Sequence, residues 1–130
     1  MTTTDVDTTE FVDRYLQVWN ESDPATRSQL VRRLWAADAV EYTEANEYQG
    51  HEALEARVSR AHTQFVEEGG SLFRLAAPPT AHHGAVLMNV EMVPAEGDGE
   101  PSWTGTIIAL LDDQDRIGRE YQFGRNLRSA

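Results

Sequence analysis

The spacing of apolar residues changes from a helical to a strand-like period at Gly69-Gly70, near the middle of the chain. Before this point, apolar residues recur every three or four positions, as on the buried face of an amphipathic helix. After it, runs rich in Val, Leu and Ile are separated by clusters of Pro, Gly and Asp, as in strands joined by turns. Helices that come first and strands that come last predict an α+β fold rather than an alternating parallel one.

Three helices are predicted in the first half of the chain. The first spans Thr8 to Glu21. The second follows Asp23, whose side chain offers an N-cap oxygen, and ends near Trp35. The third starts after Gly50, and a short strand or hairpin precedes it at Ala39 to Thr43.

Strands are predicted in the second half, where they form an antiparallel meander. The predicted runs are Ser71 to Ala77, Ala85 to Val93, Ser102 to Leu111 and Arg116 to Gly124.

Composition limits the partners that we expect. The chain has 130 residues, 22 acidic and 11 basic side chains, a net charge of -11 and no cysteine. This length fits one domain over residues 1–130, with a core at about 8–124. A surface with this much negative charge repels phosphate backbones and anionic lipids. We therefore expect neither nucleic acid nor a membrane as a partner. The lack of cysteine excludes disulfides, thiolate zinc sites and cysteine nucleophiles.

The location expected from the sequence is the cytoplasm. No apolar run approaches the roughly 20 residues that a membrane span needs. The first ten residues show neither the basic nor the apolar segment of a signal peptide.

Three segments within this order of elements carry a resemblance: Leu34 to Val40, Gly50 to Leu54, and Asp115 to Ile117. From about Thr8 to Gly124, the chain resembles the nuclear transport factor 2-like cone folds, in particular SnoaL-like polyketide cyclases and ketosteroid isomerases. The resemblance implies a cone-shaped, curved antiparallel sheet wrapped around three N-terminal helices, with an internal apolar pocket. It also implies a homodimer that covers the outer sheet face. It says less about the reaction, because this superfamily hosts isomerases, cyclases, dehydratases, epoxide hydrolases and non-catalytic binders.

The resemblance to ketosteroid isomerases also implies which side chains face the pocket. It places Val90 to Val93 and Leu110 to Asp112 on the third- and second-last strands, and successive strand residues face opposite ways. The inward strand residues are then Met88, Val90, Trp103, Gly105, Ile107, Glu120 and Gln122. The helices add Tyr15, Trp19, Trp35, Val58 and His62.

The isomerase apparatus is matched only in part. Tyr15 falls where those enzymes keep their oxyanion-binding tyrosine. The catalytic base would fall at about Thr43 and the protonated carboxylic acid at about Ile107, and neither side chain can do that chemistry. A shift of one residue would put Glu44 at the base position. The epoxide hydrolases of the superfamily need two carboxylates bridged by an arginine, and no arginine is placed inward, so this reaction is disfavoured.

The polar groups expected in the pocket indicate acid–base chemistry without a cofactor or a metal. Glu120 and His62 would form a general-base pair, or Glu120 alone would act with a pKa raised by burial. Tyr15 would donate a hydrogen bond to a developing oxyanion. These three are the candidate catalytic residues. The candidate substrate-binding residues are Trp19, Trp35, Val58, Met88, Val90, Trp103, Ile107 and Gln122.

Each candidate also has a structural interpretation. His62 would be a core histidine bonded to a carbonyl, and Tyr15 and the tryptophans would be packing residues. A register shift of one residue would make the Glu120 side chain point outward to solvent. Three hypotheses therefore stand: an enzyme that moves protons within a small, apolar, oxygen-bearing molecule; a binding module with the same pocket; and a dimerisation scaffold whose pocket is filled by its own aromatic side chains.

Overall fold

The computed structural model describes residues 8–96 and 99–126. The elements are α1 (Thr8–Asn20), α2 (Pro24–Leu34), β1 (Trp35–Tyr42), β2 (Glu47–Gln49), α3 (Gly50–Ala61), η1 (His62–Glu67), β3 (Ser71–Leu75), β4 (Thr80–His82), β5 (Ala85–Pro94), β6 (Trp103–Leu111) and β7 (Ile117–Asn126). The segment η1 is a π-helical turn that continues α3. Helices come first and strands last, so the predicted α+β order is confirmed.

The strands form one curved, open sheet in the order β2-β1-β7-β6-β5-β3, and β4 pairs with β5. The meander β5-β6-β7 is antiparallel, as predicted. The pair β1 and β7 is parallel, so the sheet is mixed rather than purely antiparallel. The strand predicted at Ala39 to Thr43 begins earlier, at Trp35, directly after α2. The first strand of the chain therefore lies beside the last one.

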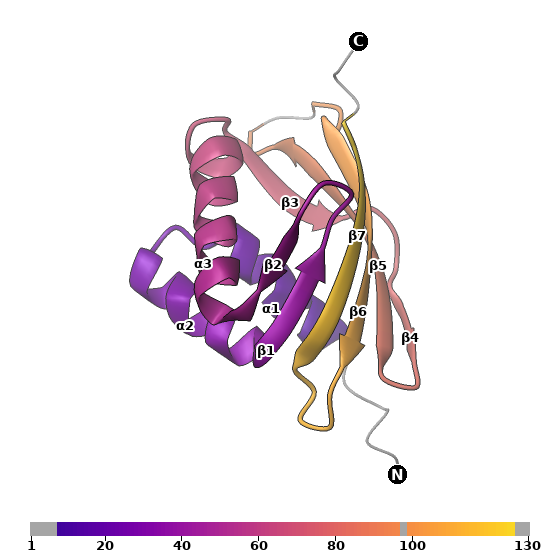
Figure 1. Cartoon of the computed structure of the whole chain (residues 1–130). Coiled ribbons are helices and arrows are strands. Elements are labelled where there is room, and N and C mark those ends of the chain that lie inside the picture. The colour runs from indigo at the N-terminus through magenta and orange to yellow at the C-terminus, as the bar shows by residue number, and fades with distance from the viewer. Residues whose placement is uncertain (1–7, 97–98, 127–130) are drawn as a thin grey trace.

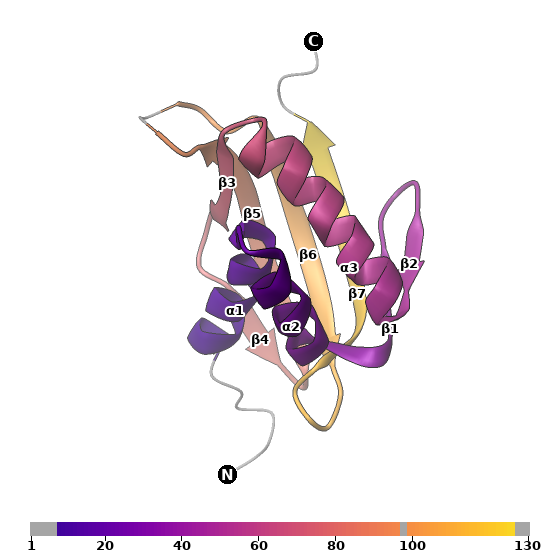
Figure 2. The same ribbon diagram turned by 90° about the vertical axis from the view of Figure 1, so that its left-hand side faces the viewer.

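The three helices lie against one face of the sheet, and the other face is left without a helix among the described residues (Figures 1 and 2). Figure 2 shows α1, α2 and α3 in front of the long strands β5, β6 and β7. The curve of the sheet and the helices over it give the cone fold that the resemblance implied.

The core lies between these two layers. The stripe of α1 buries Phe11, Val12, Tyr15, Val18 and Trp19, and α3 buries Leu54, Val58 and Ala61. From the sheet, the side chains of Met88, Val90, Ile107 and Ala109 complete the packing. Among the described residues, no helix has the length and apolar content needed to cross a lipid bilayer.

The start of α2 follows the predicted capping. The Asp23 side chain accepts a hydrogen bond from the Thr26 backbone N–H at 2.9 Å, which satisfies one of the free donors of the first turn. A hydrogen bond from the Thr26 hydroxyl, followed by this one from the backbone, lowers the pKa of Asp23. Pro24 occupies the first helical position, where its missing N–H costs nothing.

Candidate functional site

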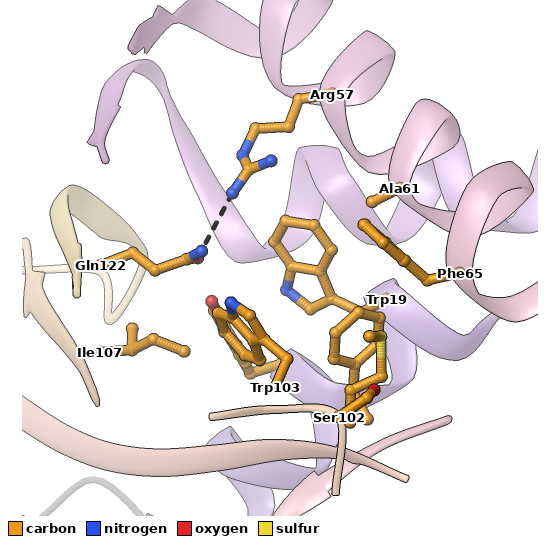
Figure 3. Close-up of a pocket in the computed structure, with 11 residues that line it drawn as sticks. Trp19, Arg57, Ala61, Phe65, Ser102, Trp103, Ile107 and Gln122 are labelled. Atoms are coloured by element: carbon orange, nitrogen blue, oxygen red, sulfur yellow. Dashed lines mark hydrogen bonds between the residues drawn. The ribbon is translucent and has the colours of Figure 1, made fainter. Parts of the chain in front are cut away.

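A cavity of about 350 Å³ lies between the helices and the sheet (Figure 3). Most of its wall is apolar and aromatic: Trp19, Ala61, Phe65, Phe73, Met92, Trp103 and Ile107. The polar side chains of its wall are Tyr15, Arg57, Ser102 and Gln122. An apolar cavity with a few convergent polar groups is the usual form of a small-molecule site.

Helix α3 brings Arg57 to the cavity. Its guanidinium carbon lies 5.2 Å from the ring centroid of Trp19 and 4.8 Å from that of Tyr48. Its Nε donates to the Glu41 carboxylate, and its Nη2 donates to Gln122 Oε1 at 3.4 Å (Figure 3). Burial alone would lower the pKa of Arg57, but the charge and the hydrogen bond of Glu41, together with Tyr48 and Tyr15, outweigh it and the pKa is raised. The guanidinium therefore stays a fixed cation at the cavity wall.

Glu120 lies behind this wall and is fully buried. Its Oε2 accepts a hydrogen bond from the Tyr15 hydroxyl at 2.6 Å, and its Oε1 accepts one from Trp35 Nε1 at 2.9 Å. Tyr15 lines the cavity and Glu120 does not. The carboxyl is therefore connected to the cavity through the tyrosine hydroxyl.

A second buried carboxylate, Glu41, lies directly opposite Glu120 in the parallel ladder of β1 and β7. Burial, followed by the charge of Glu41, raises the pKa of Glu120 well above its ordinary value; the donors on Tyr15 and Trp35 offset only part of this shift. Burial and the nearby Glu120 also raise the pKa of Tyr15 well above its ordinary value near 10, so the phenol keeps its proton. The cluster thus holds a carboxyl whose proton affinity is high beside a phenol that stays neutral.

The tryptophan of β6 shapes the sheet side of the cavity. Gly105 and Gly124 are register partners on β6 and β7, and the Trp103 indole lies over both. A Cβ added at Gly124 would come within 2.8 Å of Trp103 Nε1, and one added at Gly105 would overlap the far end of the same ring. The two glycines therefore make the room in which the indole rests against the sheet.

The predicted substrate-binding residues divide into two groups. Trp19, Trp103, Ile107 and Gln122 line the cavity. Trp35, Val58, Met88 and Val90 are buried in the core behind it. Trp35 still touches the site, because its indole N–H holds Glu120.

His62 is not joined to Glu120. It is 4% exposed, it lies at the start of η1, and its Nε2 has no hydrogen-bond partner among the described residues. Burial, then the charge of Arg27 on α2, lowers its pKa, and Glu67 and Glu21 offset part of this shift; none of these charged neighbours lines the cavity. The expectation of a His62–Glu120 pair is therefore corrected: Glu120 pairs with Tyr15 and Trp35 instead. The π-helical turn brings Phe65, not His62, to the cavity wall.

The expectation that no arginine faces the pocket is wrong, since Arg57 lines the cavity and pairs with Glu41. The second carboxylate is Glu41, not Glu44, which is exposed and accepts a hydrogen bond from the Gly124 backbone N–H at 3.0 Å. Two carboxylates and an arginine are thus present, as epoxide hydrolysis would need. Neither carboxylate lines the cavity, however, and the hydrogen bond of Arg57 to a carboxylate goes to Glu41.

Within residues 8–96 and 99–126, no group of three or more histidine and carboxylate side chains is placed to hold a metal ion. What the site can do chemically is move a proton along the row from the cavity to Tyr15 and on to Glu120, next to a fixed cation.

Comparison with known proteins rests on structure. No family profile matches the sequence, and no curated protein matches it significantly. A proposed isomerase of the SnoaL-like family from Agrobacterium tumefaciens superposes with a TM-score of 0.79 at 25% identity, over 97% of this chain and 100% of the other.

Two more distant structures share the fold. A proposed polyketide cyclase from Sinorhizobium meliloti has a TM-score of 0.64 and 20% identity, over 94% of this chain and 99% of the other. A hypothetical protein from Catenulispora acidiphila with a ketosteroid isomerase-like fold, in complex with trimethylamine, has a TM-score of 0.65 and 14% identity, over 92% of this chain and 88% of the other. The fold of the chain is therefore that of the SnoaL-like, nuclear transport factor 2-like superfamily.

Proposed function

We propose that this protein is a small-molecule enzyme that binds an apolar, oxygen-bearing substrate in the cone and catalyses proton transfer without a cofactor, as in isomerisation, cyclisation or dehydration. One observation carries the proposal. Tyr15 forms part of the cavity wall and donates a 2.6 Å hydrogen bond to Glu120, a buried carboxylate whose pKa is raised by burial and by Glu41. A carboxylate whose pKa is raised is a stronger base than an ordinary one, which suits general acid–base catalysis.

The proposed step is a concerted proton relay that begins with Glu120 in its ionised form, which predominates only above the raised pKa of this residue. A C–H bond next to the substrate carbonyl breaks, and its proton passes to Tyr15 Oη while the hydroxyl proton of Tyr15 passes to Glu120 Oε2. No tyrosinate forms, in keeping with the raised pKa of Tyr15. The electron pair of the C–H bond moves to the carbonyl oxygen as an enolate. The reverse relay delivers a proton to the same carbon or to another one.

Arg57 supplies the charge that such an intermediate needs. Its guanidinium lies at the cavity wall and is fixed by Glu41, Gln122 and two aromatic rings. A cation that is already oriented stabilises a developing oxyanion without reorganisation. Two structural relatives are described as a proposed isomerase and a proposed polyketide cyclase, and both reaction types are compatible with enolate chemistry.

The test is hydrogen exchange next to a carbonyl. The protein is incubated with 1-indanone in D₂O, and the loss of the α-proton signals is followed by ¹H NMR. We expect exchange faster than in buffer, and expect Tyr15→Phe and Glu120→Gln each to reduce it at least about a hundredfold, the usual contribution of a positioned acid–base group. Glu47→Gln, at an exposed carboxylate of β2, is the matched control and should exchange as the natural protein does.

Binding of 1-indanone without exchange of its α-protons would contradict catalysis. One observation favours this second candidate, a binding module: both oxygens of Glu120 already have donors within the protein, and neither carboxylate lines the cavity. In that case Tyr15→Phe would weaken ketone binding while exchange stayed at the buffer rate in every variant.

We also propose that the outer sheet face joins two copies of the chain. Its exposed apolar side chains are Leu72, Leu87, Leu110 and Phe123, and Tyr42 stacks on Tyr121 beside them. Phe123 is 55% exposed, which is unusual for a phenylalanine on a strand that has a neighbour on each side. Light scattering should give the mass of a dimer, and Phe123→Asp should give a monomer. Gln29→Asp, at an exposed position of α2, should leave the mass unchanged, and a monomeric natural protein would refute the dimer.

A further inference from the structure

Two of the four polar side chains that line the cavity, Arg57 and Gln122, offer it hydrogen-bond donors, whereas the hydroxyl oxygens of Tyr15 and Ser102 can accept. The Oε1 atom of Gln122 accepts from Arg57, which leaves its amide N–H groups for the cavity. Arg57 uses Nε and Nη2 in its hydrogen bonds within the described residues, and its Nη1 hydrogens make none there. The carboxylates, which would be the strong acceptors, lie behind the wall.

Trp19 provides a second, independent sign of a missing acceptor. It is 6% exposed, and its Nε1 is buried without a hydrogen-bond partner among the described residues. The ring lines the cavity, and Figure 3 shows its nitrogen on the edge of the ring turned toward Gln122. A buried N–H group without a partner is uncommon in a folded protein, because losing its hydrogen bond to water costs free energy. An acceptor atom on a bound molecule would satisfy it.

The two donors belong to one corner of the cavity. The guanidinium of Arg57 rests over the ring of Trp19, with 5.2 Å between its carbon and the ring centroid. Figure 3 shows Arg57 and Trp19 on the same side of Gln122. The rest of the wall, formed by Phe65, Phe73 and other apolar side chains, offers flat hydrophobic surface. The corner and the wall together suit a molecule with an acceptor-only end and an apolar ring body.

We propose that the substrate class of this site is a planar apolar molecule that carries an anionic, acceptor-only oxygen group, a carboxylate or an enolised β-dicarbonyl, bound by the Arg57 guanidinium and the Trp19 indole N–H. The inference rests on the proposed function for its site, and it adds the charge and polarity of the ligand. A charged acceptor forms stronger hydrogen bonds than a neutral one. A cationic ligand would be repelled by the Arg57 guanidinium, so the site selects against it.

The test compares three molecules of one shape: 2-naphthoate, 2-naphthamide and 2-naphthylmethylammonium. Their affinities for the natural protein are measured by calorimetry at pH 7. We expect 2-naphthoate to bind at least about tenfold more tightly than the amide, since hydrogen bonds to a charged group are the stronger ones, and the ammonium ion to bind most weakly. Equal affinities, or a preference for the ammonium ion, would overturn the proposal.

The variant Trp19→Phe removes the unpartnered N–H and keeps an aromatic ring. We expect this variant to lower the affinity for 2-naphthoate about tenfold, and to lower the affinity for 2-naphthylmethylammonium much less. Trp103→Phe is the matched control, because it removes the same ring area from the sheet side of the cavity. If both variants weaken 2-naphthoate equally, the indole N–H is not a ligand contact and the assignment of Trp19 is wrong.

Arg57→Lys keeps the charge but not the geometry of the guanidinium. We expect the preference for 2-naphthoate over the amide to fall at least several-fold, and Arg60→Lys, at an exposed position of α3, to leave it unchanged. Failure here and failure of the proposed catalysis are distinguishable. Exchange of 1-indanone protons without any preference for the carboxylate would overturn this inference alone, whereas the preference without exchange would overturn catalysis alone.

Discussion

Glu41 and Glu120 are direct neighbours across the parallel ladder of β1 and β7, and both side chains are completely buried. Their partners differ: Glu41 is paired with the Arg57 guanidinium, whereas Glu120 meets the neutral donors of Tyr15 and Trp35. Two buried carboxyl groups this close cannot both ionise without a large cost, and the arginine decides which one carries the charge. The high proton affinity of Glu120 thus follows first from its burial and then from the charge of Glu41, which the strand register places beside it.

The variant Glu120→Gln should be more stable than the natural protein at high pH. At low pH the two proteins should have nearly the same stability. The folded-state pKa of Glu120 is raised, so the folded protein binds a proton that the unfolded chain releases above about pH 4.3. Stability is therefore lost as pH rises from the unfolded pKa toward the folded one, by up to about 1.4 kcal/mol for each pH unit. Glutamine mimics the protonated acid, because its amide oxygen accepts hydrogen bonds as a carbonyl does and its N–H groups can donate to Glu41.

The measurement is urea unfolding of both proteins between pH 4 and pH 8. The difference in unfolding free energy should be near zero at pH 4 and should increasingly favour the variant toward pH 8. A difference that is constant over this range would show that Glu120 titrates with the same pKa in the folded and unfolded chain.

Removal of the neighbouring charge should lower the pKa of Glu120. After burial, the charge of Glu41 is the second largest cause of the raised pKa of Glu120. The variant Glu41→Gln should therefore move the titration of Glu120 to lower pH. The same change leaves Arg57 without its carboxylate and should cost about 3–5 kcal/mol of stability, as for other broken buried pairs. Carbon-13 NMR of the glutamate carboxyl groups follows the titration, and Glu47→Gln should leave that of Glu120 in place.

Tyr15→Phe should destabilise the protein by about 1–3 kcal/mol. It removes the 2.6 Å hydrogen bond to Glu120 and leaves a buried oxygen without its donor. It should also raise the pKa of Glu120 further, because this hydrogen bond lowers that pKa. The cost should therefore grow with pH. Tyr121→Phe, whose ring stacks on Tyr42 on the outer face, is the matched control in urea unfolding and should cost less.

The fold was predictable because its signals are local. The stripe of α1, the cap at Asp23 and the switch to strands after Gly69-Gly70 each depend on neighbouring residues. The parallel pair of β1 and β7 was not predicted, because it joins segments about 80 residues apart and no local pattern marks it. The position of Glu41 in the site follows from that pair. Alternation within β1 was the available signal, since Ala39 and Glu41 lie on its buried face.

The site was predictable in its aromatic wall but not in its charges. Arg57 directly precedes Val58 on α3, at the edge of the buried stripe, where a charged residue normally points to water. A long arginine side chain reaches past the stripe, and Glu41, Trp19 and Tyr48 hold it inside. His62 lies on the same stripe by helical spacing. The helix becomes π-helical at this residue, however, so side chains beyond Ala61 no longer point in the directions that α-helical spacing predicts. A sequence period cannot show such a change.

Gly105→Ala should reduce the cavity without unfolding the sheet. An alanine Cβ would overlap the far end of the Trp103 ring, and the rigid indole can only leave by swinging off the sheet into the space that a ligand would occupy. We expect the affinity for 2-naphthoate to fall at least about tenfold, about 1.4 kcal/mol, while the unfolding free energy falls by only about 1 kcal/mol. Gly118→Ala on β7 is the matched control, because its Cβ would meet its nearest neighbour, the Leu110 carbonyl oxygen, at an ordinary 3.7 Å. If both alanine variants bind the naphthoate equally well, Trp103 does not limit the volume of the cavity.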